Sequence, residues 1–424
     1  MNTTTQQIQT KPEPSALFRW GVLVFVSLAM FGNYYIYDCV SPLADLLAKQ
    51  LNFTDSNIGL LQAIYSIPNV VMVLIGGIII DKLGTRISTF IFVALCFIGA
   101  LVTALSPGLF FMATGRLIFG LGAESLIVAV TTVIGRWFKG KELSFAFGIN
   151  LTIARLGSFA ALNSPSWGKA FYNNWQTPLL IGVFAGIISV IAVIFYIMMD
   201  IYASKNYAMR NIPKQDEIKL GEMFRFGSSF WYITLLCVTF YSAIFPFQTF
   251  AVKFFMETHG VTREFGGFLS SMLTLSAMIL TPLFGLLSDY TGRRSLLMMF
   301  GSLLLIPVYL LMAYTHVSLY IPMAVMGISF SLIPAVMWPS VALIVDESRL
   351  GTAYGLMTMI QNIGLSGFNL MTGYANDTTG GYTAGMWIFS LLGLFGLLFA
   401  FLLRKSEMGA NGKGLETGSI GKKQ

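Results

Sequence analysis

Apolar stretches of about 20 residues recur along nearly the whole chain, and they limit the possible folds more than any other feature. A helix of roughly 20 apolar residues is long enough to cross the ~30 Å hydrocarbon core of a bilayer. Of the 424 residues, 55% are hydrophobic and only 11% are charged, which is more apolar surface than one soluble core can bury. The sequence therefore predicts an all-α, multi-pass membrane protein.

Twelve such stretches are expected to be membrane-spanning helices. Their approximate ranges are 20–46, 57–80, 87–106, 110–135, 142–168, 176–200, 229–255, 265–288, 295–314, 318–345, 352–375 and 383–403. A polar stretch divides them into two six-helix halves, 20–201 and 229–404, joined by a cytoplasmic linker over 202–228. We expect residues 1–19 to be a cytoplasmic segment without a secretory signal, and residues 405–424 to be a disordered cytoplasmic tail.

Basic residues collect in alternate loops, and this sets the expected orientation. Lysine and arginine near helix ends are retained in the cytoplasm. With both termini inside, the outer side receives only Lys49, Lys169, Lys253 and Arg263. The net charge of +7 then belongs to cytoplasmic loops, and no concentrated basic domain predicts nucleic-acid binding.

The cysteines and histidines do not predict a metal site or an active site. Cys39, Cys96 and Cys237 lie singly in three predicted helices, and His259 and His316 lie near outer helix ends. None has a partner at metal-ligand spacing, and no nucleophile and base recur at a suitable spacing. We therefore expect no metal, no cofactor and no enzymatic activity, and a monomer whose surroundings are the lipid bilayer.

The two halves repeat each other at a spacing of about 207 residues. "GGIIIDKLGTR" (76–86) aligns with "GLLSDYTGRR" (285–294), each a glycine-containing helix end followed by Asp, Gly and Arg. "SFAFGINLTIARLG" (144–157) likewise aligns with "TAYGLMTMIQNIG" (352–364). A duplication of this kind predicts two similar six-helix bundles facing each other.

Two charges lie near the middle of predicted helices, where a charge costs about 2.5–3.5 kcal/mol on insertion scales. They are Glu124 and Arg155, and their counterparts in the repeat are the neutral Ser331 and Asn362. A cavity with one fixed anion and one fixed cation suits a zwitterion such as an amino acid or a short peptide. The alternative is that the two side chains pair with each other and join their helices.

Aromatic and amide side chains are expected to complete the substrate site, since such groups combine apolar faces with polar tips. These residues are Tyr34, Tyr65, Tyr241, Trp338, Tyr354, Gln361 and Asn362. At the outer helix ends, Asp38 and Lys253 are a possible gate pair, with unrelated interfacial charges as the equal alternative.

Twelve helices in two homologous halves, with G-x-x-x-D-x-x-G-x-R after the second helix, resemble the major facilitator superfamily. The resemblance implies that Gly76, Asp81 and Arg86, with Asp289 and Arg293 in the second half, form cytoplasmic latch motifs. "GRLIFGLG" (115–122) is similar to the helix 4 motif of that family. Its arginine, Arg116, either assists proton movement or only snorkels or pairs near a helix end.

A narrower resemblance concerns "GRLIFGLGAESLIVA" (115–129), "WFKGKELSFAFGINLTIARLGS" (137–158) and "LGTAYGLMTMIQNIGL" (350–365), which are similar to the lysosomal dipeptide transporter branch. It implies that Glu124 holds a peptide amino terminus and Arg155 its carboxylate. The chain lacks the long N-terminal sorting region of that branch, which favours a bacterial cytoplasmic membrane over the lysosome.

The expected function is therefore secondary transport of dipeptides by alternating access, as uniport or coupled to protons; an accessory subunit is left open. One alternative is a carrier for single amino acids or small organic acids. For organic acids, Arg155 would be the sole anchor and Glu124 a proton site. Another alternative is a membrane receptor that does not transport.

Overall fold

The structure, a computed structural model, describes residues 12–138, 142–208, 225–346, 349–409 and 412–416, and this part of the chain folds into helices without strands. The first half contains α1 (Ala16–Asp38), η1 (Ser41–Leu43), α2 (Ala44–Leu51), α3 (Asp55–Leu105), α4 (Leu109–Phe138), α5 (Leu143–Leu162), α6 (Ser164–Trp167), η2 (Lys169–Asn173) and α7 (Gln176–Asn206). The second half contains α8 (Ser228–His259), α9 (Arg263–Thr291), α10 (Arg294–Tyr314), α11 (Tyr320–Ile344), α12 (Leu350–Thr379) and α13 (Thr383–Glu407). The predicted all-α fold is confirmed.

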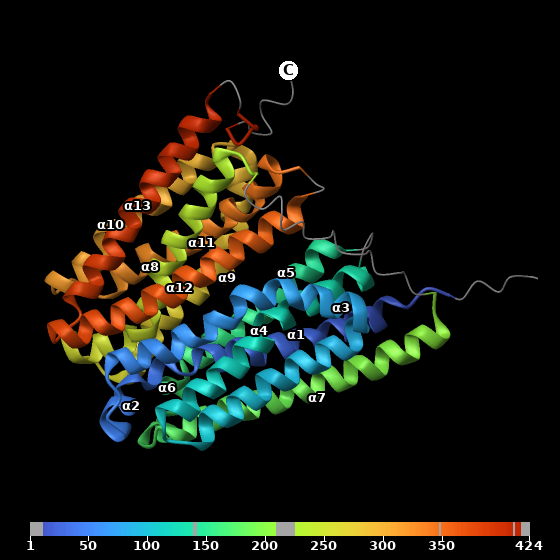
Figure 1. The fold of residues 1–424 in the computed structure, drawn as a ribbon, viewed down its shortest axis with the longest axis horizontal. Helices are drawn as coiled ribbons and strands as arrows, with labels where there is room; N and C mark the ends of the chain where they lie inside the picture. The colour runs from blue at the N-terminus through green and yellow to red at the C-terminus, as the bar shows by residue number, and fades with distance from the viewer. Residues whose placement is uncertain (1–11, 139–141, 209–224, 347–348, 410–411, 417–424) are drawn as a thin grey trace, which may run out of the picture.

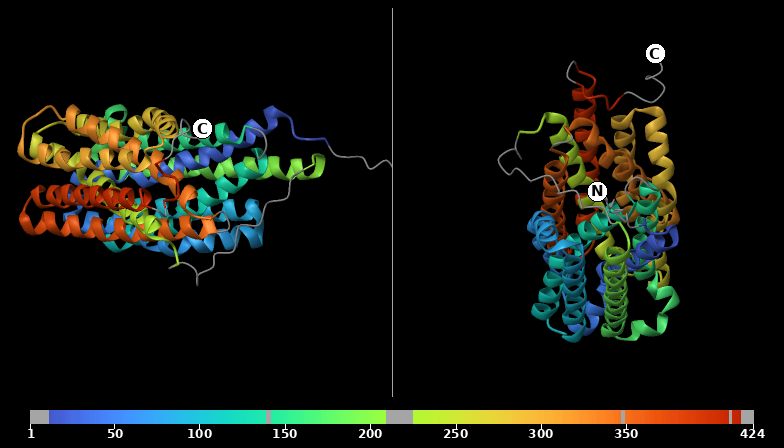
Figure 2. Two further views of the ribbon diagram at one scale, coloured as in Figure 1. Left: turned by 90° about the horizontal axis from the view of Figure 1, so that it is seen from above. Right: turned by 90° about the vertical axis from the view of Figure 1, so that its right-hand side faces the viewer.

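Each half packs around its own apolar core. The two bundles lie against each other near α2 and α6, and they diverge toward the ends of α7 and α13 (Figure 1; Figure 2). We call the side of α2, α6 and η2 the far side. The side where α7 and α13 end is the termini side.

Eleven helical segments of the described residues are long and apolar enough to span a membrane, two of them within α3. The long helix outside this set is α12, which has 30 residues. Gln361, Asn362, Asn369 and Asn376 lower its hydropathy. A polar helix is tolerated at membrane depth where its polar side chains face protein or a cavity, and α12 lies between the halves against α3 and α8.

The predicted second and third spans are joined without a loop as α3, which has 51 residues and one break. The break is at Gly84, whose φ of +77° is disfavoured for any residue with a Cβ. Gly292, which ends α9 in the second half, has a φ of +63°. Each glycine lies three residues after an aspartate of the repeated motif, so both halves place a glycine of positive φ at the same point of the repeat, although ψ differs (165° at Gly84 and 2° at Gly292).

Part of the segment that was predicted to be a disordered tail is packed against the second half. α13 continues to Glu407, and Leu415 is fully buried. The Leu415 carbonyl accepts a hydrogen bond from the backbone N–H of Arg294, and the Glu416 carboxylate accepts the N–H of Ser295 at the start of α10. The apolar Leu415 side chain and the free N–H groups of the helix start explain this contact. Residues 417–424 and most of the predicted linker, 209–224, lie outside the described residues.

Candidate functional site

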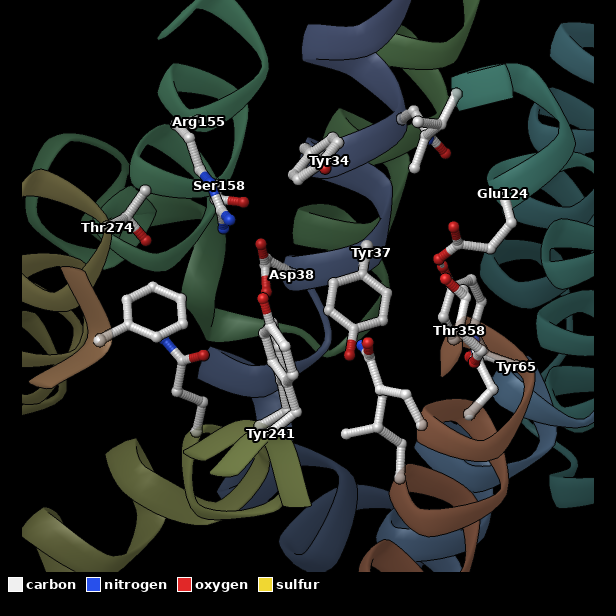
Figure 3. Close-up of a pocket in the computed structure, with 18 of the residues that line it drawn as sticks. Tyr34, Tyr37, Asp38, Tyr65, Glu124, Arg155, Ser158, Tyr241, Thr274 and Thr358 are labelled. Carbon is white, nitrogen blue, oxygen red and sulfur yellow. Dashed lines mark hydrogen bonds between the residues drawn. The ribbon is translucent and has the colours of Figure 1, made fainter. Parts of the chain in front are cut away.

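A cavity of about 240 Å³ lies between the two halves, and helices of both halves contribute its walls (Figure 3). The first half supplies residues from α1, α3, α4 and α5, and the second half supplies residues from α8, α9, α11 and α12. Pockets for drug-sized ligands are typically ~300–1,000 Å³, so this cavity fits a smaller solute. Its walls include Tyr34, Tyr65, Glu124, Arg155, Tyr241, Trp338, Gln361 and Asn362, all of which the sequence predicted to bind substrate.

Glu124 and Arg155 face this cavity from opposite sides, with α1 between them (Figure 3). The Tyr65 hydroxyl of α3 donates a hydrogen bond to Glu124 Oε1 at 3.4 Å. The Arg155 guanidinium lies 5.7 Å from the Tyr34 ring and 5.5 Å from the ring of Phe330, which belongs to the other half. Glu124 and Arg155, both described, form no ion pair, so the alternative of a direct staple between their helices does not hold in this structure.

Aromatic and amide side chains form the wall contributed by the second half. Trp338 Nε1 donates to the Tyr241 hydroxyl at 3.0 Å. Tyr354, which was predicted to contact substrate, lies behind this wall and donates its hydroxyl to the Trp338 carbonyl at 3.0 Å. Tyr354 lies on α12 beside α11, and its ring is 5.9 Å from that of Trp338. It therefore supports the indole from the side away from the cavity.

Several cavity residues were absent from the sequence prediction of the substrate site. Asp38 and Tyr37 follow Tyr34 on one face of α1, at the i, i+3, i+4 spacing that could have revealed them. Ser158 follows Arg155 at i+3 in the same way. Thr358 of the opposite wall lies three and four residues before Gln361 and Asn362 and shows the same spacing, whereas Gln248, Thr274 and Phe330 carry no comparable signal.

The predicted gate pair, Asp38 with Lys253, is wrong in its partner. Lys253 of α8 forms its ion pair with Asp55, the first residue of α3. Asp38 instead faces the cavity, where Ser158 and Arg155 are its neighbours (Figure 3). The reason is position: Asp55 begins its helix at the level of Lys253, whereas the last turn of α1 carries Asp38 inward.

Other contacts join the two halves at the far side. Arg263 of α9 donates Nε and a terminal nitrogen to the two carboxylate oxygens of Asp45, at 3.2 and 2.5 Å. Asn376 of α12 donates to Asp55 at 3.0 Å. Asp377, beyond the predicted span of α12, accepts the backbone N–H groups of Asp55 and Ser56 at 2.9 and 2.8 Å. Burial disfavours the ionised form of Asp377, but these hydrogen bonds outweigh it and lower the pKa of its carboxyl group.

Arg116 is buried and neither snorkels nor forms an ion pair with any described residue. Its guanidinium donates to the Leu61 carbonyl at 3.3 Å, the Ile36 carbonyl at 3.2 Å and Gln62 Oε1 at 2.5 Å. It also lies 5.5 Å from the Tyr65 ring. Arg116 therefore ties α4 to α1 and α3 and supports the aromatic wall beside Glu124. Its predicted role in proton movement stays a prediction.

The predicted latch motif of the first half lies at the termini side. Arg86 donates to the buried Asp200 carboxylate of α7 at 2.5 Å and to its carbonyl at 2.8 Å. Arg136 and the Trp137 indole also donate to Asp200. Asp81 is exposed. The partner of Arg86 is Asp200, a residue that the motif does not contain.

In the second half, Asp289 pairs with Arg294 at 2.6 Å, whereas Arg293 was the arginine assigned to the motif from the sequence. Arg294 follows Gly292 by two residues, as Arg86 follows Gly84, and it is therefore the true counterpart. Arg293 is the residue before α10. Gly76 lies in α3 against Ser125 of α4.

Sequence comparison supports the arrangement of two halves. The sequence model of the Major Facilitator Superfamily matches residues 26–266 and 233–420. The lysosomal dipeptide transporter MFSD1 of Homo sapiens is 32% identical over 414 residues, covering 94% of this chain and 89% of that protein. The Bos taurus protein of the same name is 34% identical over 388 residues, covering 88% of this chain and 83% of the relative.

Comparison with solved structures supports the same architecture. A bacterial homologue of the human lysosomal transporter Spinster, in an inward-facing and unoccupied conformation, superimposes with a TM-score of 0.76. The sequences are 17% identical, and the match covers 93% of this chain and 98% of the other. At this identity the likeness establishes the fold alone.

Proposed function

The chain belongs to the major facilitator superfamily and is a multi-pass membrane transporter, not an enzyme, and we propose that the solute it carries is a dipeptide. The observation that carries the proposal is that Glu124 and Arg155 line one cavity without pairing. A small zwitterion can bind between them, with its ammonium at the carboxylate and its carboxylate at the guanidinium. The similarity to lysosomal dipeptide transporters supports the same class of solute.

The chemistry at each end is specific. A guanidinium presents a planar pair of N–H donors that matches both oxygens of a carboxylate, and Arg155 supplies it. Glu124 offers oxygens to an ammonium, while the Tyr65 hydroxyl fixes one of them. A substrate without one of its charged ends leaves the corresponding protein charge uncompensated.

The wall of the second half suits side chains of varied chemistry. Tyr241, Trp338 and Phe330 present apolar ring faces, and Gln248 and Gln361 present amides that both donate and accept hydrogen bonds. No charged residue belongs to this wall among the described lining residues. Recognition is therefore concentrated on the two termini of the peptide, and side chains between them contact neutral groups.

The relative placement of the two halves supports alternating access. In this conformation the far side is closed by ion pairs between the halves, and the bundles diverge at the termini side (Figure 1). Rocking the halves about the cavity would break the far-side pairs and bring the repeated motifs of the termini side together. By the distribution of lysine and arginine, the termini side is the cytoplasmic one.

A binding screen with matched peptides tests the proposal. The purified protein in detergent is heated with L-alanyl-L-alanine, with its N-acetylated form or with its amidated form. A ligand that binds only the folded state stabilises it by mass action and so raises the unfolding temperature. At a ligand concentration of 100 times Kd, the free energy of unfolding increases by about 2.7 kcal/mol. We expect the free dipeptide to stabilise the protein and both capped forms to lose this effect. Equal stabilisation by the capped peptides would overturn the two-ended site.

The alternatives give different results in the same assay. A carrier for organic acids, anchored on Arg155 alone, would be stabilised by small carboxylates and by the N-acetylated peptide. A carrier for single amino acids would prefer L-alanine to the dipeptide. A receptor that does not transport would bind but show no counterflow of radiolabelled L-alanyl-L-alanine in liposomes.

A further inference from the structure

Arg155, the proposed anchor for the peptide carboxylate, is held in the cavity by aromatic rings and not by hydrogen bonds. Its guanidinium carbon lies over the Tyr34 ring of α1, 5.7 Å from the ring centroid, and over the Phe330 ring of α11, 5.5 Å from that centroid. Within the described residues, this guanidinium makes no hydrogen bond and no ion pair. The two rings belong to different halves of the protein, so both halves determine where the cation lies.

These ring contacts leave the hydrogen-bond donors of Arg155 unused. A cation over an aromatic face is attracted by the negative charge density of that face. The five N–H donors of a guanidinium point outward in its own plane, and contact with a ring does not require them. The side chain is therefore positioned while its donors remain available for a carboxylate.

Asp38 is the group of the cavity that competes for these donors. It is the last residue of α1 and is 6% exposed, and its carboxyl group points toward Ser158 and Arg155 of α5 (Figure 3). Buried charges in proteins are usually paired, so a direct ion pair between Asp38 and Arg155 would be expected. Among the ion pairs of the described residues, however, this pair is absent. The rings therefore hold Arg155 in a position that its nearest carboxylate does not determine.

The Phe330 ring is itself firmly placed. It is 2% exposed and lies within α11, at 6.4 Å from the ring of Phe240 and 6.1 Å from the ring of Phe245, both on α8. A ring packed against two others has little freedom to follow a guanidinium that turns away. Phe330 thus defines a fixed position over which the cation is stabilised.

We propose that Phe330 is a positioning residue for the substrate: its ring holds the Arg155 guanidinium away from Asp38 and keeps the N–H donors free for the peptide carboxylate. The inference rests on the proposed function. Without the ring, the guanidinium is free to turn to Asp38, and the peptide must then compete with that carboxylate for the same donors. Ordering a long side chain on binding also lowers affinity, and the ring removes part of this cost beforehand.

The first test compares a variant that loses the ring with one that keeps it. The Kd for L-alanyl-L-alanine is measured by calorimetry on the purified protein in detergent. We expect Phe330→Leu, which keeps an apolar side chain, to raise the Kd by about tenfold, in line with the strength of a desolvated cation–π contact. Phe330→Tyr should retain most of the wild-type affinity. An unchanged Kd in Phe330→Leu, or an equal loss in Phe330→Tyr, would overturn the inference.

The second test asks whether Asp38 captures the released guanidinium. Asp38→Asn is made alone and together with Phe330→Leu, and the four Kd values form a double-mutant cycle. If the ring keeps Arg155 from Asp38, Asp38→Asn should improve binding several-fold more in the Phe330→Leu background than in the wild type. A ring that only contacts the peptide, or only supports the fold, predicts the same change in both backgrounds. Equal changes would therefore contradict the positioning role even if Phe330→Leu binds weakly.

Phe247 provides the matched control. It is a phenylalanine of the second half, 1% exposed, that packs against Tyr309 and Phe389 and is not among the lining residues of the cavity. Phe247→Leu should lower the unfolding temperature of the ligand-free protein, because a buried ring is lost, but should leave the Kd near the wild-type value. A comparable loss of affinity in this variant would show that Phe330→Leu acts through the fold and would rule out the positioning role.

Failure of the inference and failure of the proposed function are distinguishable in these measurements. Dipeptide binding by the wild type that Phe330→Leu does not weaken would refute the role of Phe330 and leave the dipeptide function intact. Absence of any dipeptide binding by the wild type would refute the proposed function, and the positioning role with it.

Discussion

Lys253 of α8 and Asp55 at the start of α3 form an ion pair across the two halves of the protein, and both side chains are buried. Arg263 and Asp45 form a second pair at the same side. Both pairs can form only while the halves meet at this side, because each joins a residue of the first half to a residue of the second. These contacts therefore hold the far side closed while the termini side is open.

Removing the first pair should favour opening of the far side. The variant Asp55→Asn leaves the Lys253 ammonium buried without its partner while the far side is closed, and opening relieves this cost by exposing the ammonium to water, so we expect the variant to open more often by at least about tenfold. The experiment uses a chain in which Cys39, Cys96 and Cys237 are replaced and Gln248 is changed to cysteine. The measurement is the rate at which a membrane-impermeant maleimide, added from the far side, labels this cysteine. Lys49→Met is the control because Lys49 pairs with Asp45 within one half and its side chain is 67% exposed. Labelling no faster than in the parent would contradict the gating role.

Replacing Arg155 by lysine should weaken dipeptide binding although the charge is kept. Lysine cannot present two parallel donors to a carboxylate, and we expect the Kd for L-alanyl-L-alanine to rise by about tenfold or more. Arg155→Ala should abolish measurable binding. Arg404→Lys, on α13 away from the cavity, should bind like the wild type. The idea of a bidentate clamp fails if calorimetry gives equal affinities for Arg155→Lys and wild type.

Asp377 should make a contribution to stability that disappears in acid. Its pKa is lowered in the folded protein by hydrogen bonds from Asp55 and Ser56. The contribution is therefore present above the unfolded pKa of about 3.9 and is lost as the pH falls through the lower folded value. The unfolding temperature of Asp377→Asn should lie below that of the wild type at pH 6, and the two should converge as the pH falls below about 4. A difference that stays constant down to pH 3 would exclude this contribution.

Much of the architecture was predictable because it depends on local composition. Each apolar stretch is long enough to span a bilayer, and backbone groups in lipid must be satisfied within a helix. The internal repeat predicted two matching halves, and the positive φ of both Gly84 and Gly292 agrees with it. A hydropathy criterion alone does not identify α12 as a span, because its amide side chains lower its hydropathy. These amides face other helices and the cavity.

Pairings between distant residues were predicted less well. The sequence places Asp38, Asp55 and Lys253 near the same side, but it does not show which carboxylate meets the lysine. A helix turns by about 100° per residue, so small differences in register decide whether a side chain faces a partner, the cavity or lipid. Asp200 as the partner of Arg86 follows from the same limitation. Arg294, in contrast, was available from the repeat itself, since it follows Gly292 by two residues as Arg86 follows Gly84.

The sequence by itself determined that this protein is a helical membrane transporter with a repeated half, and that Glu124 and Arg155 are its informative buried charges. Hydrophobic length and the cost of a charge in lipid are properties of single segments, so they can be read without a structure. The tertiary structure decided that these two charges face one cavity without pairing, that Asp38 joins them, and that Asp55 closes the far side. Those facts depend on how helices distant in sequence rotate and pack, which no single segment specifies.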